Sequence, residues 1–453
     1  MRGATQGPEV SLEQVLESRD QRAQDQRQWL ARGGVLVCMT LNMPGPRKRF
    51  PLADAAFRQG ERLLEDQLAG GGLAVLERQE MDRPAGLEYF LRVQGRPDQA
   101  KDCALALEER PPLGRLLDID VFDQDGRQIS RRQLGRPPRQ CLLCPRPAAE
   151  CARSRAHGIQ AAAEKAISLM NEYFDGQFVQ FCASQAQRAL LHEAACGPKP
   201  GLVDNRNSGA HRDMDQFSFL NSAAALGEYF RQAAWQGVRF KGPPEELLAR
   251  LRPLGLAAER EMRAATGGAN THKGAIFSLG VLCGGAGLLY GRGEPLCPER
   301  LLTLGGRIAA SAAGDFNRGG EDTAGRRLYR QMGAQGARGQ AAAGFPGAKL
   351  ALEALDQCLS RGFGWNAACC GALCALMAQI EDTNLLHRGG REGLEYVRWK
   401  ARGIWENLSS EETFLSQMAA LDTLLTDQNL SPGGCADLLA TALFARFVSA
   451  WTE

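Results

Sequence analysis

The chain has 453 residues, which is too long for one ordinary domain and predicts two or three. Its 54 basic and 52 acidic residues leave a formal net charge of +2, so the composition produces no overall electrostatic field that would attract nucleic acid or a membrane surface. The N-terminal residues lack the apolar stretch of a secretory signal, and the most apolar run, residues 275–290, is too short to span a bilayer. We therefore expect a cytoplasmic protein, with that run as a buried helix and with fourteen cysteines that are reduced or bind metal.

Before residue 160, short runs of β type alternate with helical stretches, which predicts a small α+β domain over residues 1–158. The expected strands are residues 35–41, 73–76, 87–93 and 116–122. The expected helices include residues 53–68 and 101–109. The segment 135–157 is rich in Pro, Arg and Cys and looks like the join to the next domain.

After residue 160 the β signal nearly vanishes, and Ala/Leu-rich segments with helical spacing follow one another. Five of these segments are residues 161–173, 178–195, 215–230, 275–289 and 367–380. Loops with Gly and Pro separate the segments, so residues 159–453 are predicted to form an all-α, bundle-like domain.

The first long loop of this half, residues 197–215, concentrates polar side chains. They are Lys199, Asp204, Asn207, His211, Asp213 and Asp215. Carboxylates beside a lysine suit Mg²⁺ that shares itself with phosphate oxygens. A simpler alternative is that Asp213 only caps the next helix, with Gln216 completing a capping box.

The second loop, residues 266–274, ends where an apolar helix begins. It offers Asn270, Thr271, His272 and Lys273, and backbone N–H groups at a helix start can bind an anion. The spacing is not that of a Walker A loop, so an ordinary helix start is the alternative, and a lone His272 is more often structural than catalytic.

Three later stretches repeat this arrangement of polar residues near helix starts. Arg338 lies in a Gly-rich context that suits a phosphate clamp. Asp382, Asn384 and Arg388 follow a buried helix, and Ser431 opens a Pro-Gly-Gly turn before another helix. Each stretch alone could be turn chemistry, but their recurrence favours one shared site.

The motifs PKPGLVDxxNxGAHxDMD, NTHKGAIFSLG, GARGxAxxGFP, DTNxxxRGG and LSPGGxADLLA occur in this order over residues 165–453. Together they resemble triphosphoribosyl-dephospho-coenzyme A synthase. The resemblance implies that ATP and dephospho-coenzyme A are substrates, and that the 2′-hydroxyl of dephospho-coenzyme A displaces adenine from the ATP ribose. It calls for Mg²⁺ and basic residues on the triphosphate, a general base for the hydroxyl and a donor to adenine.

In the N-terminal half, the run GRLLDIDVF predicts a strand with Asp118 and Asp120 on one face. Two carboxylates side by side can hold Mg²⁺ against a polyphosphate leaving group. The alternative is an edge strand with a solvated face. The turn-forming loop LNMPGPRKR adds Arg47 and Lys48, which suit phosphates.

This half, over residues 9–158, resembles apo-citrate lyase phosphoribosyl-dephospho-coenzyme A transferase in the words LNMPGPRKR, GRLLDIDVF and GRPPRQCLLC…CARSRAH. The resemblance implies transfer of the prosthetic group to a serine of the acyl carrier subunit of citrate lyase, with release of pyrophosphate. The two carboxylates on one strand also look like a nucleotidyltransferase, by analogy of fold alone.

Cys141, Cys144, Cys151 and His157 have the spacing C-x2-C-x6-C-x5-H, which permits tetrahedral Zn²⁺ in a structural role. Unliganded, reduced cysteines are the alternative.

The sequence thus predicts a bifunctional transferase of cofactor biosynthesis that uses Mg²⁺ and has neither nucleic acid nor membrane as a partner. The alternatives are a nucleotide hydrolase, in which water replaces the acceptor hydroxyl, and a non-catalytic factor that binds carrier protein and nucleotide. The candidates for catalysis are Asp118, Asp120, His211, Asp213, Asp215 and His272. The candidates for nucleotide or phosphate binding are Arg47, Lys48, Lys199, Asn207, Asn270, Thr271, Lys273, Arg338, Asn384, Arg388 and Ser431. The candidates for Mg²⁺ binding are Asp118, Asp120, Asp204, Asp213, Asp215 and Asp382.

Overall fold

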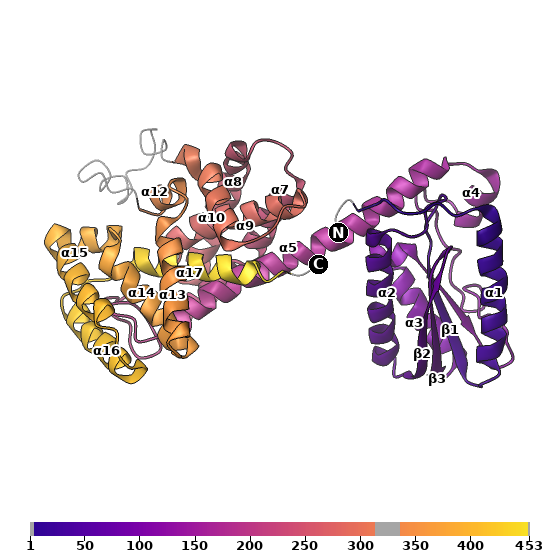
Figure 1. Cartoon of the computed structure of the whole chain (residues 1–453), viewed down its shortest axis with the longest axis horizontal. Coiled ribbons are helices and arrows are strands. Elements are labelled where there is room, and N and C mark those ends of the chain that lie inside the picture. The colour runs from indigo at the N-terminus through magenta and orange to yellow at the C-terminus, as the bar shows by residue number, and fades with distance from the viewer. Residues whose placement is uncertain (1–3, 313–335, 452–453) are drawn as a thin grey trace. The chain divides into compact units, whose positions relative to one another are not determined.

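A computed structural model describes residues 4–312 and 336–451 of the chain (Figure 1). It divides into two compact units, Met1–Gly176 and Gln177–Glu453, and the division falls inside one helix. Each unit has hydrophobic clusters of its own, so each buries its own core.

The first unit is built on a four-stranded antiparallel sheet in the order β2-β3-β1-β4. The strands are β1 (Val35–Leu41), β2 (Ala74–Arg83), β3 (Gly86–Gln94) and β4 (Leu117–Phe122), so all four predicted strands are confirmed. Strand β2 is longer than predicted because its added residues alternate along a largely exposed outer edge and carry little apolar signal. Strand β4 forms the other edge of the sheet.

Helices cover both faces of this sheet (Figure 1). The predicted helices appear as α2 (Pro51–Gly70) and α3 (Pro97–Glu108), whose apolar sides pack on the same face. Helix α1 (Leu12–Leu30) covers the opposite face through Trp29. It did not figure among the expected elements, because only two of its residues are buried and it has no apolar stripe to detect.

The remaining elements of this unit lead into the helical half of the chain. They are the short helix η1 (Leu113–Leu116), helix α4 (Ala148–Ser154) and the long helix α5 (Ile159–Ala195). Two separate helices were expected over the range of α5, but the helix continues through Gly176, because good helix-forming segments flank this one glycine on both sides. The early part of α5 packs Ala166 and Met170 against Phe50 and Leu52 of the first unit.

The second unit is all helical in the residues described, which confirms the predicted class. After the end of α5 its elements are α6 (Gln216–Ala225), α7 (Gly227–Arg239), α8 (Pro244–Ala265), α9 (Lys273–Gly291), α10 (Pro298–Ala309), α12 (Gly336–Ala342), α13 (Pro346–Ser360), α14 (Trp365–Gln379), α15 (Thr383–Glu406), α16 (Glu411–Asp427) and α17 (Gly433–Val448). The single helix expected over residues 215–230 is two, because the chain breaks at Leu226 between α6 and α7.

Helix α9 is the centre of this unit and is the predicted buried helix. Of the helices described, it alone is long and apolar enough to cross a membrane, and 83% of that stretch is buried inside the unit. Its glycines allow close packing, since a Cβ atom on Gly287 would lie 2.2 Å from the carbonyl oxygen of Ala234 in α7. The Gly-rich apolar run is therefore the core of a helical unit.

One predicted cap is corrected by the structure. Asp215, and not Asp213, caps helix α6, and Ser218 rather than Gln216 completes the capping box. The helix begins one residue after Asp215, so only that carboxylate can reach the first free backbone N–H groups.

Candidate active sites

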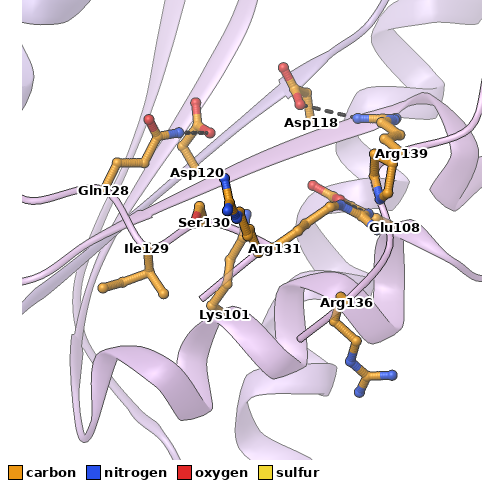
Figure 2. A pocket seen from close by; sticks show the side chains of 12 residues that line it. Lys101, Glu108, Asp118, Asp120, Gln128, Ile129, Ser130, Arg131, Arg136 and Arg139 are labelled. Atoms are coloured by element: carbon orange, nitrogen blue, oxygen red, sulfur yellow. Dashed lines mark hydrogen bonds and ion pairs between the residues drawn. The ribbon is translucent and has the colours of Figure 1, made fainter. Parts of the chain in front are cut away.

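The two carboxylates of β4 face a cavity of about 610 Å³ at the edge of the sheet (Figure 2). Asp118 and Asp120 project from one face, whereas Leu117, Ile119 and Val121 are buried on the other, as the alternation predicted. Gln128 donates a hydrogen bond of 2.6 Å to Asp120. The strand is thus an edge strand, but its polar face lines a pocket instead of open solvent.

Two buried side chains of α3 satisfy the outer backbone of this edge strand. The N–H of Ile119 donates to Glu108 at 2.8 Å, and the carbonyl of Ile119 accepts from Lys101 at 2.6 Å. Arg131 then pairs with the second oxygen of Glu108, which neutralises the buried carboxylate. This arrangement leaves β4 with fewer free backbone groups for another strand to pair with, and it fixes the strand that carries the aspartates.

Arginines from the segment after β4 surround the same cavity (Figure 2). Arg139 is largely buried and forms an ion pair of 3.1 Å with Asp118. Arg131, Arg132 and Arg136 also line the cavity. Guanidinium groups bind phosphate through forked hydrogen bonds, so a pocket with carboxylates on one wall and arginines on others suits a metal-bound polyphosphate.

The charge on Asp120 is disfavoured by its surroundings. Burial, with the neighbouring charge of Asp118, raises the pKa of Asp120 above its usual range. A divalent cation between the two carboxylates would relieve this repulsion, and carboxylate oxygens are the ligands that Mg²⁺ takes in proteins. The chemistry of Asp118 and Asp120 therefore fits a site for a divalent cation such as Mg²⁺.

The basic loop after β1 does not contribute to this cavity. Arg47 forms an ion pair of 3.1 Å with Glu9, and Lys48 donates to the carbonyl of Met43. Neither side chain is among those that line the pocket. Their proposed part in phosphate binding stays a prediction.

Cys141, Cys144, Cys151 and His157 converge, as their spacing predicted. One potential ligand atom from each lies within 4.8 Å of all the others, and in residues 4–312 and 336–451 no other group of three or more His, Cys, Asp or Glu side chains does so. The Cys144 and Cys151 sulfurs are 3.5 Å apart, and His157 Nε2 is 3.3 Å from the Cys144 sulfur. A backbone N–H of Arg146, with His157, lowers the pKa of Cys144 to about 6, which favours the thiolate form that binds metals.

In the second unit, the predicted Lys199 and His272 belong to one buried polar group. The Lys199 ammonium donates to the Glu193 carboxylate at 2.7 Å, and both side chains are almost fully buried. Burial disfavours the charged lysine, but Glu193 and other nearby acids outweigh it and raise the pKa of Lys199. Burial and the nearby Lys199 lower the pKa of His272 to about 3.

His272 is therefore neutral near pH 7, and its two ring nitrogens differ. Nδ1 lies 2.7 Å from the hydroxyl of Ser222, whereas the buried Nε2 has no hydrogen-bond partner among the described residues. Thr271 Oγ1 is buried without a partner in the same way. Buried polar atoms without partners are uncommon and are expected where a ligand binds.

A second set of predicted residues meets from two loops and from the first turns of α15. Arg388 donates to His211 Nδ1 at 3.3 Å, and His211 Nε2 lies 2.8 Å from the Ser431 hydroxyl. Since Nδ1 accepts from the guanidinium, the neutral ring carries its proton on Nε2 and donates it to Ser431. Arg388 also binds the carbonyl of Ala210 and the side chain of Asn429, so it fixes the arrangement of these loops.

Asp204 and Asp382, which were expected to bind Mg²⁺, have both carboxylate oxygens occupied by backbone N–H groups. Asp204 accepts from Lys199, Arg206 and Asn207 within its own loop. Asp382 caps α15 and also accepts from Cys435 at 2.8 Å. Asn207 is likewise engaged, because its amide donates to Asp422. These bonds give all three side chains a role in shaping the loops.

Helix starts come together around this polar group. A Cβ atom on Gly274, at the start of α9, would lie 2.1 Å from the Asp437 carboxylate in α17. A Cβ atom on Gly433 would lie 2.6 Å from the Asn384 amide at the start of α15. Burial, with Glu193 and Asp382 nearby, raises the pKa of Asp437 well above its usual range. The glycines of the motifs thus permit close approach between helix N-termini, whose N–H groups attract anions.

The other predicted residues lie nearer the surface. Asp213 and Asn270 are exposed, and Lys273 forms a partly exposed ion pair of 3.0 Å with Glu259. Asp215 is exposed and acts as the helix cap, and the backbone and side chain of Ser218 lower its pKa. Arg338 is half-buried in α12. Residues 333–335 of its Gly-rich segment lie outside the described residues.

Sequence reasoning did not select several residues that the structure places in the two sites. They are Lys101, Glu108, Gln128, Arg131, Arg136 and Arg139 in the first unit, and Glu193 and Ser222 in the second. The run RRQLGRPPR, separated from the predicted strand by eight residues, was the available signal for the arginines. No signal in the sequence marked Glu193, because it lies in the last turn of a helix where a glutamate is ordinary.

Comparison with known proteins shows that each unit matches a family of transferases. Residues 10–173 match the family of apo-citrate lyase phosphoribosyl-dephospho-CoA transferase, CitX, and residues 180–453 match ATP:dephospho-CoA triphosphoribosyl transferase, CitG. Protein CitXG of Haemophilus influenzae is 34% identical over 97% of both chains, and Protein CitXG of Leuconostoc mesenteroides is 32% identical over 98% of both. The 2-(5''-triphosphoribosyl)-3'-dephosphocoenzyme-A synthase of Haemophilus ducreyi is 36% identical over 67% of this chain and 98% of its own. The chain therefore belongs to the CitXG family, in which a CitX domain precedes a CitG domain, and it is a transferase.

Proposed function

We propose that the chain makes the prosthetic group of citrate lyase and attaches it to the acyl carrier subunit. The support is the full-length similarity to proteins with both domains, together with a polar site in each unit. We assign attachment to the N-terminal domain, residues 1–158 with the start of α5, and synthesis to the helical remainder. A cytoplasmic location and a nucleotidyltransferase-like fold of the first unit remain predictions from the sequence.

In the synthase reaction, the 2′-hydroxyl oxygen of dephospho-coenzyme A attacks C1′ of the ATP ribose. The new C1′–O bond forms as the C1′–N bond to adenine breaks. The hydroxyl proton is transferred, in balance, to the adenine nitrogen that was bonded to C1′. We assign the triphosphate to Lys199, Lys273, Arg338 and the helix starts, because lysine, arginine and backbone N–H groups bind phosphate oxygens. The partnerless Nε2 of His272 is available for a hydrogen bond to a substrate.

The exposed Asp213 is our candidate for the general base or a Mg²⁺ ligand of this site, since no backbone group or cap engages its carboxylate in the described structure. His211 suits an orienting role better than that of a base, because Arg388 already donates to its Nδ1 and would repel a second ring proton. Burial, followed by that nearby guanidinium, lowers the pKa of His211.

In the attachment reaction, the hydroxyl of the carrier serine attacks the α-phosphorus of the triphosphoribosyl group, and pyrophosphate leaves. Asp118 and Asp120 would hold Mg²⁺, which supplies charge neutralisation for the leaving group when it is bound. Arg131, Arg136 and Arg139 stand on the other walls to bind the phosphate oxygens. The pairing of two carboxylates with these arginines in one cavity is the observation that carries this proposal.

We also propose that the Cys/His group holds one structural Zn²⁺ per chain. Zinc takes Cys sulfur at about 2.3 Å and His nitrogen at about 2.0–2.1 Å, which sets ligand atoms roughly 3.5–4 Å apart. The 3.3 and 3.5 Å separations and the 4.8 Å limit are close to that geometry and need only small shifts. All fourteen cysteines are free thiols, so no disulfide competes for these four residues.

Mass spectrometry of a reaction with ATP, dephospho-coenzyme A and apo-carrier tests the proposed function. We expect free adenine, a triphosphoribosyl adduct of dephospho-coenzyme A, and a carrier whose mass rises by the phosphoribosyl-dephospho-coenzyme A group. Adenine without an adduct would indicate the nucleotide hydrolase. Binding of both partners without either product would indicate the assembly factor.

A further inference from the structure

Two of the four potential metal ligands, Cys141 and Cys144, closely follow Arg139 in the chain, and Arg139 lines the cavity of β4. Residues 139–148 close on themselves as a hairpin, because Cys141 N donates to the Arg146 carbonyl and Ala148 N donates to the Arg139 carbonyl, each at 2.8 Å. The hairpin thus begins at Arg139, which lines the cavity, and carries Cys141 and Cys144. We call residues 139–148 the cysteine hairpin.

Two arginines fasten the cysteine hairpin to the start of β4 in a reciprocal way. Arg115, just before β4, donates to the carbonyls of Gln140 and Cys141 at 2.9 and 3.2 Å. Arg139 donates in return to the carbonyls of Arg115 and Leu117 at 2.6 and 2.8 Å. Each guanidinium therefore holds backbone of the other segment, and neither contact survives if the hairpin moves away.

The position of the Arg139 side chain depends on that fastening. Its third hydrogen bond runs to Asp118 at 3.1 Å, so the same guanidinium touches the carboxylate pair of the site. Three of its five N–H groups are used in these bonds, and two are left to donate to a ligand in the cavity. The hairpin has little buried apolar surface to hold such a side chain by packing alone: Leu142 is only partly buried against the cluster that contains Phe50, and the adjoining α4 adds the buried Cys151.

We propose that metal bound at Cys141, Cys144, Cys151 and His157 fixes the cysteine hairpin and thereby positions Arg139 as a phosphate-binding residue of the attachment reaction. This inference rests on the proposed function of the N-terminal domain. Metal occupancy then governs attachment to the carrier and leaves adenine release unaffected. The metal acts through Arg139 and takes no part in the chemistry.

The test uses the full-length protein and the variants Cys144→Ser, Arg139→Gln and their combination. Cys297→Ser, an exposed thiol in the helical unit, is the control for loss of a cysteine, and Arg127→Gln, an exposed arginine outside the cavity, is the control for loss of a guanidinium. Zinc per chain, adenine release, and the KM and kcat of carrier modification are measured for each. Hydrogen exchange of the amides of residues 136–148 gives a readout that needs no activity.

We expect Cys144→Ser to lose zinc and to slow carrier modification about 10- to 100-fold, mainly through the KM for the triphosphoribosyl substrate. Arg139→Gln should lose as much activity and keep its zinc, with partial recovery in Arg139→Lys. The combined variant should be no slower than Arg139→Gln alone, because both substitutions remove the same contribution, which is phosphate binding by a correctly placed Arg139. Adenine release and both controls should stay within about twofold of wild type.

Three results would overturn the inference. They are a zinc-free protein that modifies the carrier at the wild-type rate, a combined variant whose loss is the product of the two single losses, and unchanged exchange of residues 136–148 after zinc is removed. A wild-type, zinc-loaded protein that releases adenine but never modifies the carrier would instead refute the proposed function of the N-terminal domain. The exchange measurement would then still decide whether metal fixes the hairpin.

Discussion

The buried pair of Lys199 and Glu193 gives the sharpest test of the helical unit. Replacing Lys199 with Met removes the cation and leaves the Glu193 carboxylate, itself almost fully buried, without its partner. At 2.7 Å the attraction between the two charges is about 6 kcal/mol at an effective dielectric constant of ~20. Breaking a buried pair by removing one partner costs about 3–5 kcal/mol, so the free energy of unfolding should fall by that amount.

Tryptophan fluorescence during urea unfolding reports on this unit, because five of the six tryptophans lie in it and only Trp29 lies in the other. Glu193→Gln should cost a similar amount, and the double variant should cost less than the sum of the two, because it leaves no unpaired charge. Arg231→Met is the matched control, since its ion pair with Glu228 is exposed and should contribute about 1 kcal/mol or less. A loss below about 1 kcal/mol in Lys199→Met, or strict additivity in the double variant, would refute the buried pair.

Further predictions concern the sites and the fold. Asp118→Asn with Asp120→Asn should abolish carrier modification while adenine release persists and the triphosphoribosyl intermediate accumulates; if both activities disappear, the two sites are not independent. Because burial holds the pKa of His272 at about 3, well below its unfolded value, the stability it contributes is fully present above about pH 6.5 and is lost as the pH falls toward 3. The free energy of unfolding should therefore decline there by up to about 1.4 kcal/mol per pH unit from this one group, and His272→Asn should remove that contribution; an unchanged pH profile of the variant would contradict a buried, neutral ring. Gly274→Ala should destabilise the helical unit and stop adenine release, because the new Cβ would meet Asp437 at 2.1 Å, whereas Gly403→Ala, with open space around it, should leave stability equal or raised by up to about 1 kcal/mol in thermal unfolding. Equal melting temperatures for these two glycine variants would show that the starts of α9 and α17 are not in close contact.

Periodicity alone predicted most of the fold. A strand of the first unit could be recognised from the alternation around Ile119, and α9 from its uninterrupted apolar run. Helix α1 was not predicted, because it presents almost no apolar side to the sheet. The break between α6 and α7 at Leu226 was not predicted either, because the residues on both sides favour a helix and the turn depends on tertiary packing.

Spacing along the chain could predict which particular side chains meet only where they are close in sequence, whereas the meeting of His211, Arg388 and Ser431 was expected only from the recurrence of polar residues near helix starts. Asp118 and Asp120 are two residues apart on one strand, and the alternation of side chains puts them together. Arg139 reaches them from a hairpin whose course is set by its own hydrogen bonds and by Arg115, and no local pattern encodes that. Glu193 in the last turns of α5 pairs with Lys199 in the loop that follows. From the sequence alone, Glu193 therefore looks like an ordinary solvated glutamate.

The long helix α5 decides where this chain can be cut. Its early residues Ala166, Leu169 and Met170 belong to the hydrophobic cluster that contains Phe50 and Leu116, so they are part of the first unit. A fragment that stops before α5 would leave an apolar surface without its cover and should aggregate, whereas one that ends near Gly176 keeps that cluster whole. During synthesis on the ribosome, the first unit likewise cannot complete its core until the first half of α5 has emerged. The junction between the two enzymes is thus a helix whose two halves belong to different units, so neither unit has its full core without part of it.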